Sequence, residues 1–115
     1  MFLQHVHVDV LDGQEAAFEV ALCEVRRRVF MSPGFRGLAV AQGAELPSSY
    51  LVQVRWETAE ELADVVDSGR FERCWAPVEP LLARPRVVTY FLERPGLAAQ
   101  GPGATVDLDL AWLSG

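Results

Sequence analysis

The chain has 115 residues, of which half are apolar, and a net charge of −6. This length corresponds to one domain with its own hydrophobic core, and the negative charge disfavours nucleic acid or an anionic membrane as a partner. All ten basic residues are arginine, which excludes a lysine Schiff base and a P-loop. No apolar run approaches the roughly 20 residues of a membrane span. Cys23 and Cys74 are predicted to be reduced thiols, so we expect a soluble cytoplasmic protein.

Alternation of apolar and polar residues predicts a strand over residues 2–10. One face of this strand is apolar, with Phe2, Val6, Val8 and Val10, and the other is mixed. The mixed face carries Leu3, His5, His7 and Asp9. A helix is then predicted to begin at a capping box formed by Asp12 and Glu15 and to run to about Phe30. Its apolar stripe has helical spacing and consists of Phe18, Ala21, Leu22, Val25 and Val29.

A proline and a glycine in Ser32-Pro33-Gly34 are predicted to end that helix. Two further strands are expected over residues 35–42 and 50–56, with a loop between them. The second of these strands alternates clearly. One of its faces carries Tyr50, Val52, Val54 and Trp56.

Thr58 occupies an N-cap position and Glu61 follows three residues later, which predicts a second helix over residues 59–67. A short helical turn over residues 70–75, an irregular connection rich in proline and a fourth strand over residues 86–92 are expected next. Beyond this strand the composition becomes that of a linker, and the alternating segment 106–113 predicts an extra strand. We therefore divide the chain into a domain of residues 1–94 and a linker with a strand-like tail, residues 95–115.

The predicted order of elements is β-α-β-β-α-β, a ferredoxin-like α+β fold. Such a fold has a four-stranded antiparallel sheet with its helices on one face. The other face would expose apolar surface to water in a monomer. We therefore expect two copies to pack their sheets face to face as a homodimer.

Four short motifs occur in a characteristic order along the chain. These motifs are Pro33-Gly34-Phe35, Trp56-Glu57, Glu60-Glu61-Leu62 and Ser68 with Phe71. In this arrangement residues 1–92 resemble the antibiotic biosynthesis monooxygenase family, whose members are dimeric α+β barrels. The resemblance implies a pocket between the sheet and the two helices of each subunit. Some members of the family oxygenate polycyclic phenols to quinones without metal or flavin, and others degrade haem.

The chain departs from the family at positions where function resides. Val65 stands where many members have a histidine and where haem-degrading members have a tryptophan. Trp75 replaces the iron-ligating histidine of the haem-degrading members, and His7 replaces their asparagine. Haem degradation is therefore not expected, and the resemblance implies a reaction with no cofactor.

His5 and His7 are the polar candidates for catalysis, because they lie two residues apart on one strand face, about 7 Å between Cα atoms. They could form a general base pair or bind a metal, or they could simply be hydrogen-bonded residues near a strand end. The correspondence of His7 with the family's pocket asparagine suggests that this face looks toward the helices. Asp9 shares the face, but no ligand spacing motif supports a metal site, and none is predicted.

The substrate-lining candidates are aromatic and aliphatic side chains that could contact a flat ring. They are Trp75, Trp56, Phe71, Val65 and Tyr50. The same side chains could instead be ordinary core. Arg55 and Arg86 could hold an anionic substituent or pair with carboxylates.

Two functions remain open. The first is a cofactor-independent monooxygenase that acts on a small aromatic or polycyclic phenolic compound, with His7 removing the phenolic proton, with or without His5. The second is a non-catalytic dimeric barrel that binds a small apolar ligand or has a structural or regulatory role. A polar cavity containing His7 would favour the enzyme, and a cavity filled by Val65, Phe71 and Trp75 would favour the module.

Overall fold

A computed structural model describes residues 1–101 of the chain and confirms the predicted order of elements. The sheet consists of β1 (Phe2–Asp9), β2 (Phe35–Gln42), β3 (Ser49–Trp56) and β4 (Val87–Leu92). The helices are α1 (Glu15–Phe30), α2 (Ala59–Asp67), α3 (Arg70–Trp75), η1 (Ala76–Leu81) and η2 (Pro95–Leu97). The strand predicted over residues 106–113 lies outside the described residues. No helix within residues 1–101 is long and apolar enough to cross a membrane.

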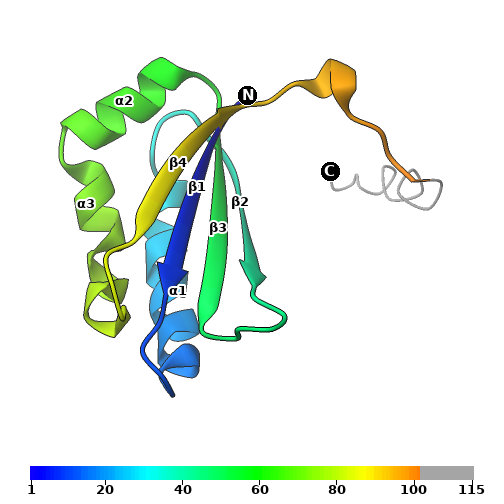
Figure 1. Cartoon of the computed structure of the whole chain (residues 1–115). Helices are drawn as coiled ribbons and strands as arrows, with labels where there is room; N and C mark the ends of the chain where they lie inside the picture. The colour runs from blue at the N-terminus through cyan, green and yellow to red at the C-terminus, as the bar shows by residue number, and fades with distance from the viewer. Residues whose placement is uncertain (102–115) are drawn as a thin grey trace.

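The four strands form one antiparallel sheet in the order β2-β3-β1-β4 (Figure 1). The central strand β1 pairs with β3 on one side and with β4 on the other, and Val6 lies opposite both Val52 and Val88. Residues that lie opposite one another in an antiparallel pair share a face of the sheet. The register therefore places alternate residues of all three strands on the same face.

The hydrophobic core lies between this sheet and the helices. Its strand residues are Val6, Val8 and Val10 of the β1 segment and Tyr50, Val52, Val54 and Trp56 of β3. Its residues from α1 are Phe18, Leu22, Val25 and Val29, in agreement with the predicted stripe. Leu62 and Val65 of α2 and Phe71, Cys74 and Trp75 of α3 complete the helical side.

The face of β1 that carries the histidines is the open one. Val6 and Val8 are buried beneath the helices, whereas His5 is half-buried and His7 is exposed on the opposite face. The expectation that the histidine face looks toward the helices is therefore wrong. The reason is packing, because Val6, Val8 and Val10 supply apolar surface to the core, and Gln4 is the one polar side chain buried with them.

The two predicted helix starts differ in outcome. The N-cap role of Thr58 is confirmed, because its hydroxyl oxygen accepts a hydrogen bond from the backbone N–H of Glu61 at 3.2 Å. The capping box predicted at Asp12 is wrong: the N-cap of α1 is Gln14, and no side chain caps it. Gln14 N–H instead donates to the carbonyl of Leu11 at 3.0 Å in a turn through Gly13, which has φ 81°.

Gly34 explains why the Pro-Gly-Phe motif precedes β2. Its φ of 84° is a left-handed conformation, and a Cβ added there would lie 2.8 Å from the Cβ of Glu61. The Gly34 carbonyl also accepts a hydrogen bond from Glu57 N–H at 2.8 Å. Glycine thus lets the start of β2 lie directly against the start of α2.

The proline-rich connection after α3 is more regular than expected. It forms the 3₁₀ helix η1, and β4 begins at Val87, one residue later than predicted. An isolated bridge between Val10 and Leu82 holds the end of this connection against the end of β1. The connection therefore positions Arg86 immediately before β4.

Candidate functional site

A groove runs along the helix-covered face of the sheet between α2, α3 and β4. It consists of two adjoining recesses of about 400 and 320 Å³ that share Val66 and Tyr90. The side chains that matter most for its chemistry are Phe2, Leu62, Val66, Phe71, Arg86 and Tyr90. We call this feature the α2–β4 groove. It lies on the side of the sheet that the helices cover.

The local sequence explains how the walls of the groove are built. Val88 and Tyr90 lie opposite Val6 and Gln4 of β1, so both face the helices. The Tyr90 ring stacks on Phe2 with ring centroids 6.0 Å apart, and about half of the Tyr90 side chain remains exposed. Leu62 and Val66 are four residues apart on α2 and form the opposite wall.

Arg86 is the cation of the groove, and only 11% of its side chain is exposed; Glu72 and Glu79 line the same recess. Its guanidinium donates to Glu72 at 2.7 Å and forms an ion pair with Glu79. The same guanidinium lies over the rings of Phe71 and Trp75, at 5.2 and 6.0 Å from their centroids. Such a cation over aromatic faces, partly removed from water, interacts with anions more strongly than a solvated one.

Three buried N–H groups have no acceptor among the described residues, and one of them belongs to Arg86 of the groove. They are Arg86 Nε, Trp75 Nε1 and Gln4 Nε2. Buried donors are normally paired, because an unpaired one costs about 1–3 kcal/mol. Arg86 Nε is therefore the one unpaired donor on a residue that lines the groove.

The predicted site residues Val65, Phe71 and Trp75 are packed together in the core. Their exposed fractions are 5%, 7% and 0%, and the Phe71 and Trp75 rings are 6.2 Å apart. Only Phe71 also lines the groove. The space that these three residues were expected to surround is thus filled by their own side chains.

Tyr50 and Trp56 lie at opposite ends of β3, about 20 Å apart at the usual rise of a strand. The Tyr50 ring packs on Phe18 at 4.6 Å, and its hydroxyl donates to Glu19 at 2.7 Å. Burial, together with the Glu19 carboxylate, raises the pKa of Tyr50 to about 12. Trp56 Nε1 donates to Gln4 Oε1 at 3.3 Å. These two residues do not belong to one site.

His5 and His7 each contact a neighbour on β3 across the open face. His7 Nε2 lies 2.8 Å from Ser49 Oγ, and His5 Nε2 lies 3.0 Å from Gln53 Nε2. The His5 ring also packs against Phe91 at 4.6 Å. Asp9 and His7 approach to 4.0 Å, but no group of three metal-binding side chains occurs within residues 1–101.

The groove contains residues that sequence reasoning did not select. Tyr90 and Val66 were not proposed, and Arg86 was considered only as one of two strand arginines. The alternation of β4 could have placed Val88 and Tyr90 on one face. The pairing of Arg86 with Phe71, fifteen residues earlier, has no local signal.

Comparisons with known proteins agree with this architecture. A candidate antibiotic biosynthesis monooxygenase from Bordetella bronchiseptica is 26% identical over 81% of this chain and 97% of that protein, with a TM-score of 0.71. A second candidate from Nitrosomonas europaea is 18% identical over 81% of this chain and 98% of that protein, with a TM-score of 0.68.

A variant of SnoaB, a cofactor-independent oxygenase from Streptomyces nogalater, shares the fold at 16% identity. That match covers 85% of this chain and 98% of SnoaB, with a TM-score of 0.69. No curated protein matches the sequence. The family model described as antibiotic biosynthesis monooxygenase matches residues 1–76, about two thirds of the chain. The chain therefore belongs to the antibiotic biosynthesis monooxygenase family.

Proposed function

We propose that the protein is a cofactor-independent monooxygenase whose substrate, a small aromatic or polycyclic phenolic compound, binds in the α2–β4 groove. The observation that carries this proposal is the position of Arg86, a cation that lies over Phe71 and Trp75, pairs with Glu72 and Glu79, and stands where the apolar part of the groove ends. An apolar wall suits a flat hydrocarbon ring system, and the cation suits an oxygen substituent that becomes negative. Family membership supports the same reaction type.

In the proposed reaction the substrate itself supplies the electrons. Removal of a proton gives a phenolate, which Arg86 stabilises and which is a stronger reductant than the neutral phenol. In this proposal Glu72 or Glu79, each of which pairs with Arg86, accepts that proton. Molecular oxygen then forms a carbon–oxygen bond, and loss of water leaves a carbonyl. One CH₂ group and one O₂ thus become one C=O group and one H₂O, with no external reductant.

His5 and His7 have no part in this groove, since they lie on the opposite face of the sheet. Their predicted catalytic role stays a prediction and would require a substrate on the open face. Replacing His7 by alanine separates the two possibilities. The groove proposal expects unchanged turnover, and a sharp loss of turnover would move the site to the open face.

Filling the groove is the direct test of the proposal. Val66 lines both recesses and is 40% exposed, so Val66→Trp adds a large ring to the groove without entering the core. Val20→Trp is the matched control, because Val20 lies on α1 and is 74% exposed. Anthrone oxidation is followed by oxygen uptake and by quinone absorbance. We expect Val66→Trp to lower kcat/KM at least about tenfold and the control to leave it unchanged. Equal activity of both variants would refute the groove as the site.

The non-catalytic alternative has one observation in its favour. Val65, Phe71 and Trp75 fill the interior space in which a family pocket was expected. Three results together would identify a binding module. The wild-type protein would consume no oxygen with a panel of anthrones, it would bind them in fluorescence titrations, and Val66→Trp would abolish that binding.

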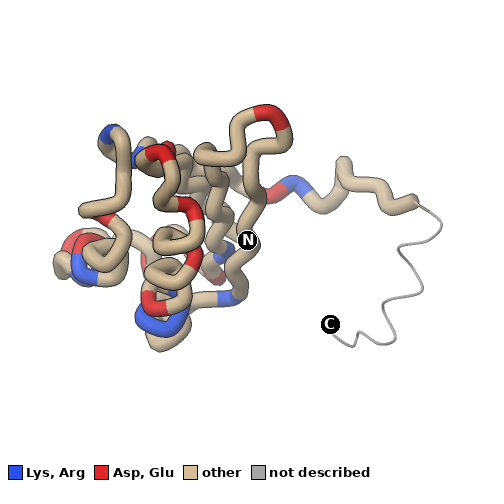
Figure 2. The backbone as a smooth tube through the Cα atoms, turned by 90° about the horizontal axis from the view of Figure 1, so that it is seen from below, with Lys and Arg blue, Asp and Glu red and all other residues tan. Residues whose placement is uncertain are grey.

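We also propose that two copies pair through the open face of the sheet. This face exposes Leu51, Val87 and Phe91, and most charged residues lie on the helices and loops instead (Figure 2). Leu51→Asp is expected to give monomers in sedimentation experiments, because it buries a charge in the paired faces. Leu97→Asp, on η2, is the control and should leave the dimer intact. A wild-type monomer at micromolar concentration would contradict the proposal. The cytoplasmic location stays a prediction.

A further inference from the structure

A separate recess, of about 350 Å³, opens between α1 and α3. Four of the six residues that line it are arginines, namely Arg27, Arg28, Arg70 and Arg73; the other two are Met31 and Cys74. We call these four residues the arginine cluster. Such a concentration of positive charge is unexpected on a chain whose net charge is −6.

The cluster is not neutralised by its surroundings. Among residues 1–101 its only carboxylate partner is Glu24, which accepts from Arg27 Nε at 3.1 Å and from Arg28 Nε at 2.9 Å. Four guanidinium groups and one carboxylate leave a local charge of 4 − 1 = +3. The hydrogen bonds from Arg27 and Arg28 lower the pKa of Glu24 to about 2, so this count holds at neutral pH.

Arginines elsewhere in the described part of the chain are paired differently. Arg36 pairs with Glu57, Arg55 with Glu93, and Arg84 with Asp9, and Arg86 has two carboxylate partners. Each of these four arginines therefore has at least one carboxylate partner. The arginine cluster is different: Arg27 and Arg28 share Glu24, and Arg70 and Arg73 have no carboxylate partner within residues 1–101.

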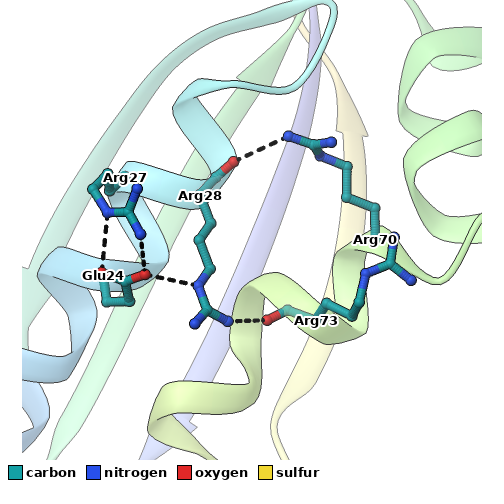
Figure 3. Close-up of polar contacts among 5 residues, drawn as sticks. All are labelled: Glu24, Arg27, Arg28, Arg70 and Arg73. Carbon is teal, nitrogen blue, oxygen red and sulfur yellow. Dashed lines mark hydrogen bonds and ion pairs between the residues drawn. The ribbon is translucent and has the colours of Figure 1, made fainter.

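Three guanidinium groups of the cluster, those of Arg28, Arg70 and Arg73, donate to neutral acceptors. Arg28 Nη1 donates to the Arg73 carbonyl at 2.7 Å, and Arg70 Nη2 donates to the Arg28 carbonyl at 3.5 Å, so α1 and α3 are linked in both directions (Figure 3). Arg70 Nε also donates to Ser32 Oγ at 2.9 Å. Neutral oxygens fix the positions of the arginines but leave their charge uncompensated. Each guanidinium has five N–H groups, and most of them stay available.

The remaining wall of the recess does not repel an anion. Burial raises the pKa of the Cys74 thiol, which therefore lines the recess as a neutral group. Met31 is apolar and 68% exposed, and it offers a surface for the uncharged part of a ligand. The recess thus combines several fixed cationic donors with a small apolar wall.

We propose that the arginine cluster is a binding site for a small molecule that carries a phosphate group. A phosphate has about two negative charges and accepts several hydrogen bonds from arginines in a bidentate manner, which matches a local charge of +3 better than a single carboxylate does. The site is independent of the α2–β4 groove and of the proposed oxygenase reaction. The phosphate could be the free ion or a phosphate monoester, since both present the same group.

Calorimetric titration of the full chain tests the site, with inorganic phosphate and glycerol 3-phosphate as probes. Sodium chloride at matched ionic strength and glycerol serve as blanks. We expect saturable binding of at least one probe beyond the blanks. Stronger binding of glycerol 3-phosphate identifies a monoester site, and stronger binding of inorganic phosphate identifies a site for the free ion. Absence of saturable binding of both probes would overturn the proposal.

Two variants locate the binding. Arg27→Gln/Arg73→Gln removes two charges from the cluster and is expected to weaken binding at least about tenfold. Arg36→Gln/Arg94→Gln removes the same charge elsewhere and should bind as the wild type does. Equal weakening in the two double variants would show a general charge effect and refute the site. Glu24→Gln tests the cluster in the opposite direction, and it does not depend on the first double variant folding. It raises the local positive charge and should therefore tighten phosphate binding. Unchanged or weaker binding would count against the cluster.

Discussion

Replacing Tyr50 by phenylalanine should change how the protein responds to alkaline pH. Tyr50 is 2% exposed, and its hydroxyl donates to Glu19 at 2.7 Å and accepts from Gln42 Nε2 at 3.2 Å. Ionisation in the folded state would place a buried phenolate beside a carboxylate. Burial first, and then Glu19, therefore raise the pKa of Tyr50 from 10.0 to about 12.

The sign and size of the effect follow from linkage. Between pH 10 and 12 the unfolded chain loses the Tyr50 proton while the folded chain retains it, so the free energy of unfolding decreases as the pH rises. At pH 11 this loss is about 1.4 kcal/mol, and the upper limit at higher pH is about 2.7 kcal/mol. At pH 8 the loss is absent. Tyr50→Phe cannot show this loss, but at pH 8 it is about 1–3 kcal/mol less stable than the wild type because the hydrogen bond to Glu19 is missing.

Urea unfolding, followed by circular dichroism between pH 8 and 11, measures both the cost of losing the hydrogen bond and the alkaline loss of stability. We expect Tyr50→Phe to be less stable than the wild type at pH 8 and the difference to shrink by about 1.4 kcal/mol at pH 11. Tyr90→Phe retains Tyr50 and should show the same alkaline loss as the wild type. A difference between wild type and Tyr50→Phe that stays constant from pH 8 to pH 11 would show that burial of the Tyr50 hydroxyl does not perturb its ionisation.

Three other substitutions test separate parts of the fold. Thr58→Ala removes the N-cap of α2 and should lower the free energy of unfolding by about 1 kcal/mol in urea, whereas Ser48→Ala, in a loop, should have little effect. Val25→Ala creates a cavity where α1 meets the sheet and should cost about 2–3 kcal/mol; a loss below about 0.5 kcal/mol, typical of a surface site, would contradict the packing. Glu24→Gln should be less stable than the wild type above about pH 5. Because the pKa of Glu24 is lowered from 4.5 to about 2, that difference should vanish as the pH falls to 2, and a difference that persists there would disprove the ion-pair origin.

The elements themselves could be predicted because their signals are local. The apolar stripe of α1 and the alternation of β3 repeat with the period of a helix and of a strand, and burial in the structure follows those periods. Thr58 could be identified as a cap because its acceptor and the N–H of Glu61 are only three residues apart. The start of α1 was predicted wrongly because a turn through Gly13, rather than the Asp12 side chain, satisfies the backbone there.

The orientation of β1 could not be settled by alternation alone. A strand has two faces, and its sequence does not say which one the helices will cover. The family resemblance suggested that His7 looks toward the helices, but the structure buries Val6 and Val8 there instead. The register between β1 and β3 decides which face of β1 the helices cover, because Val6 shares a face with Val52, which is also fully buried.

The sequence by itself determined the secondary structure, the β-α-β-β-α-β order and the family, since each depends on residues close together in the chain. Only the tertiary structure showed that Arg86 lies over Phe71 and that Arg28 meets Arg73, 45 residues away. Ion pairs and cation–aromatic contacts between distant segments have no periodic signature, because they depend on how helices and strands pack. For this reason the chemistry of the protein became visible only after α3 had been placed between α1 and β4.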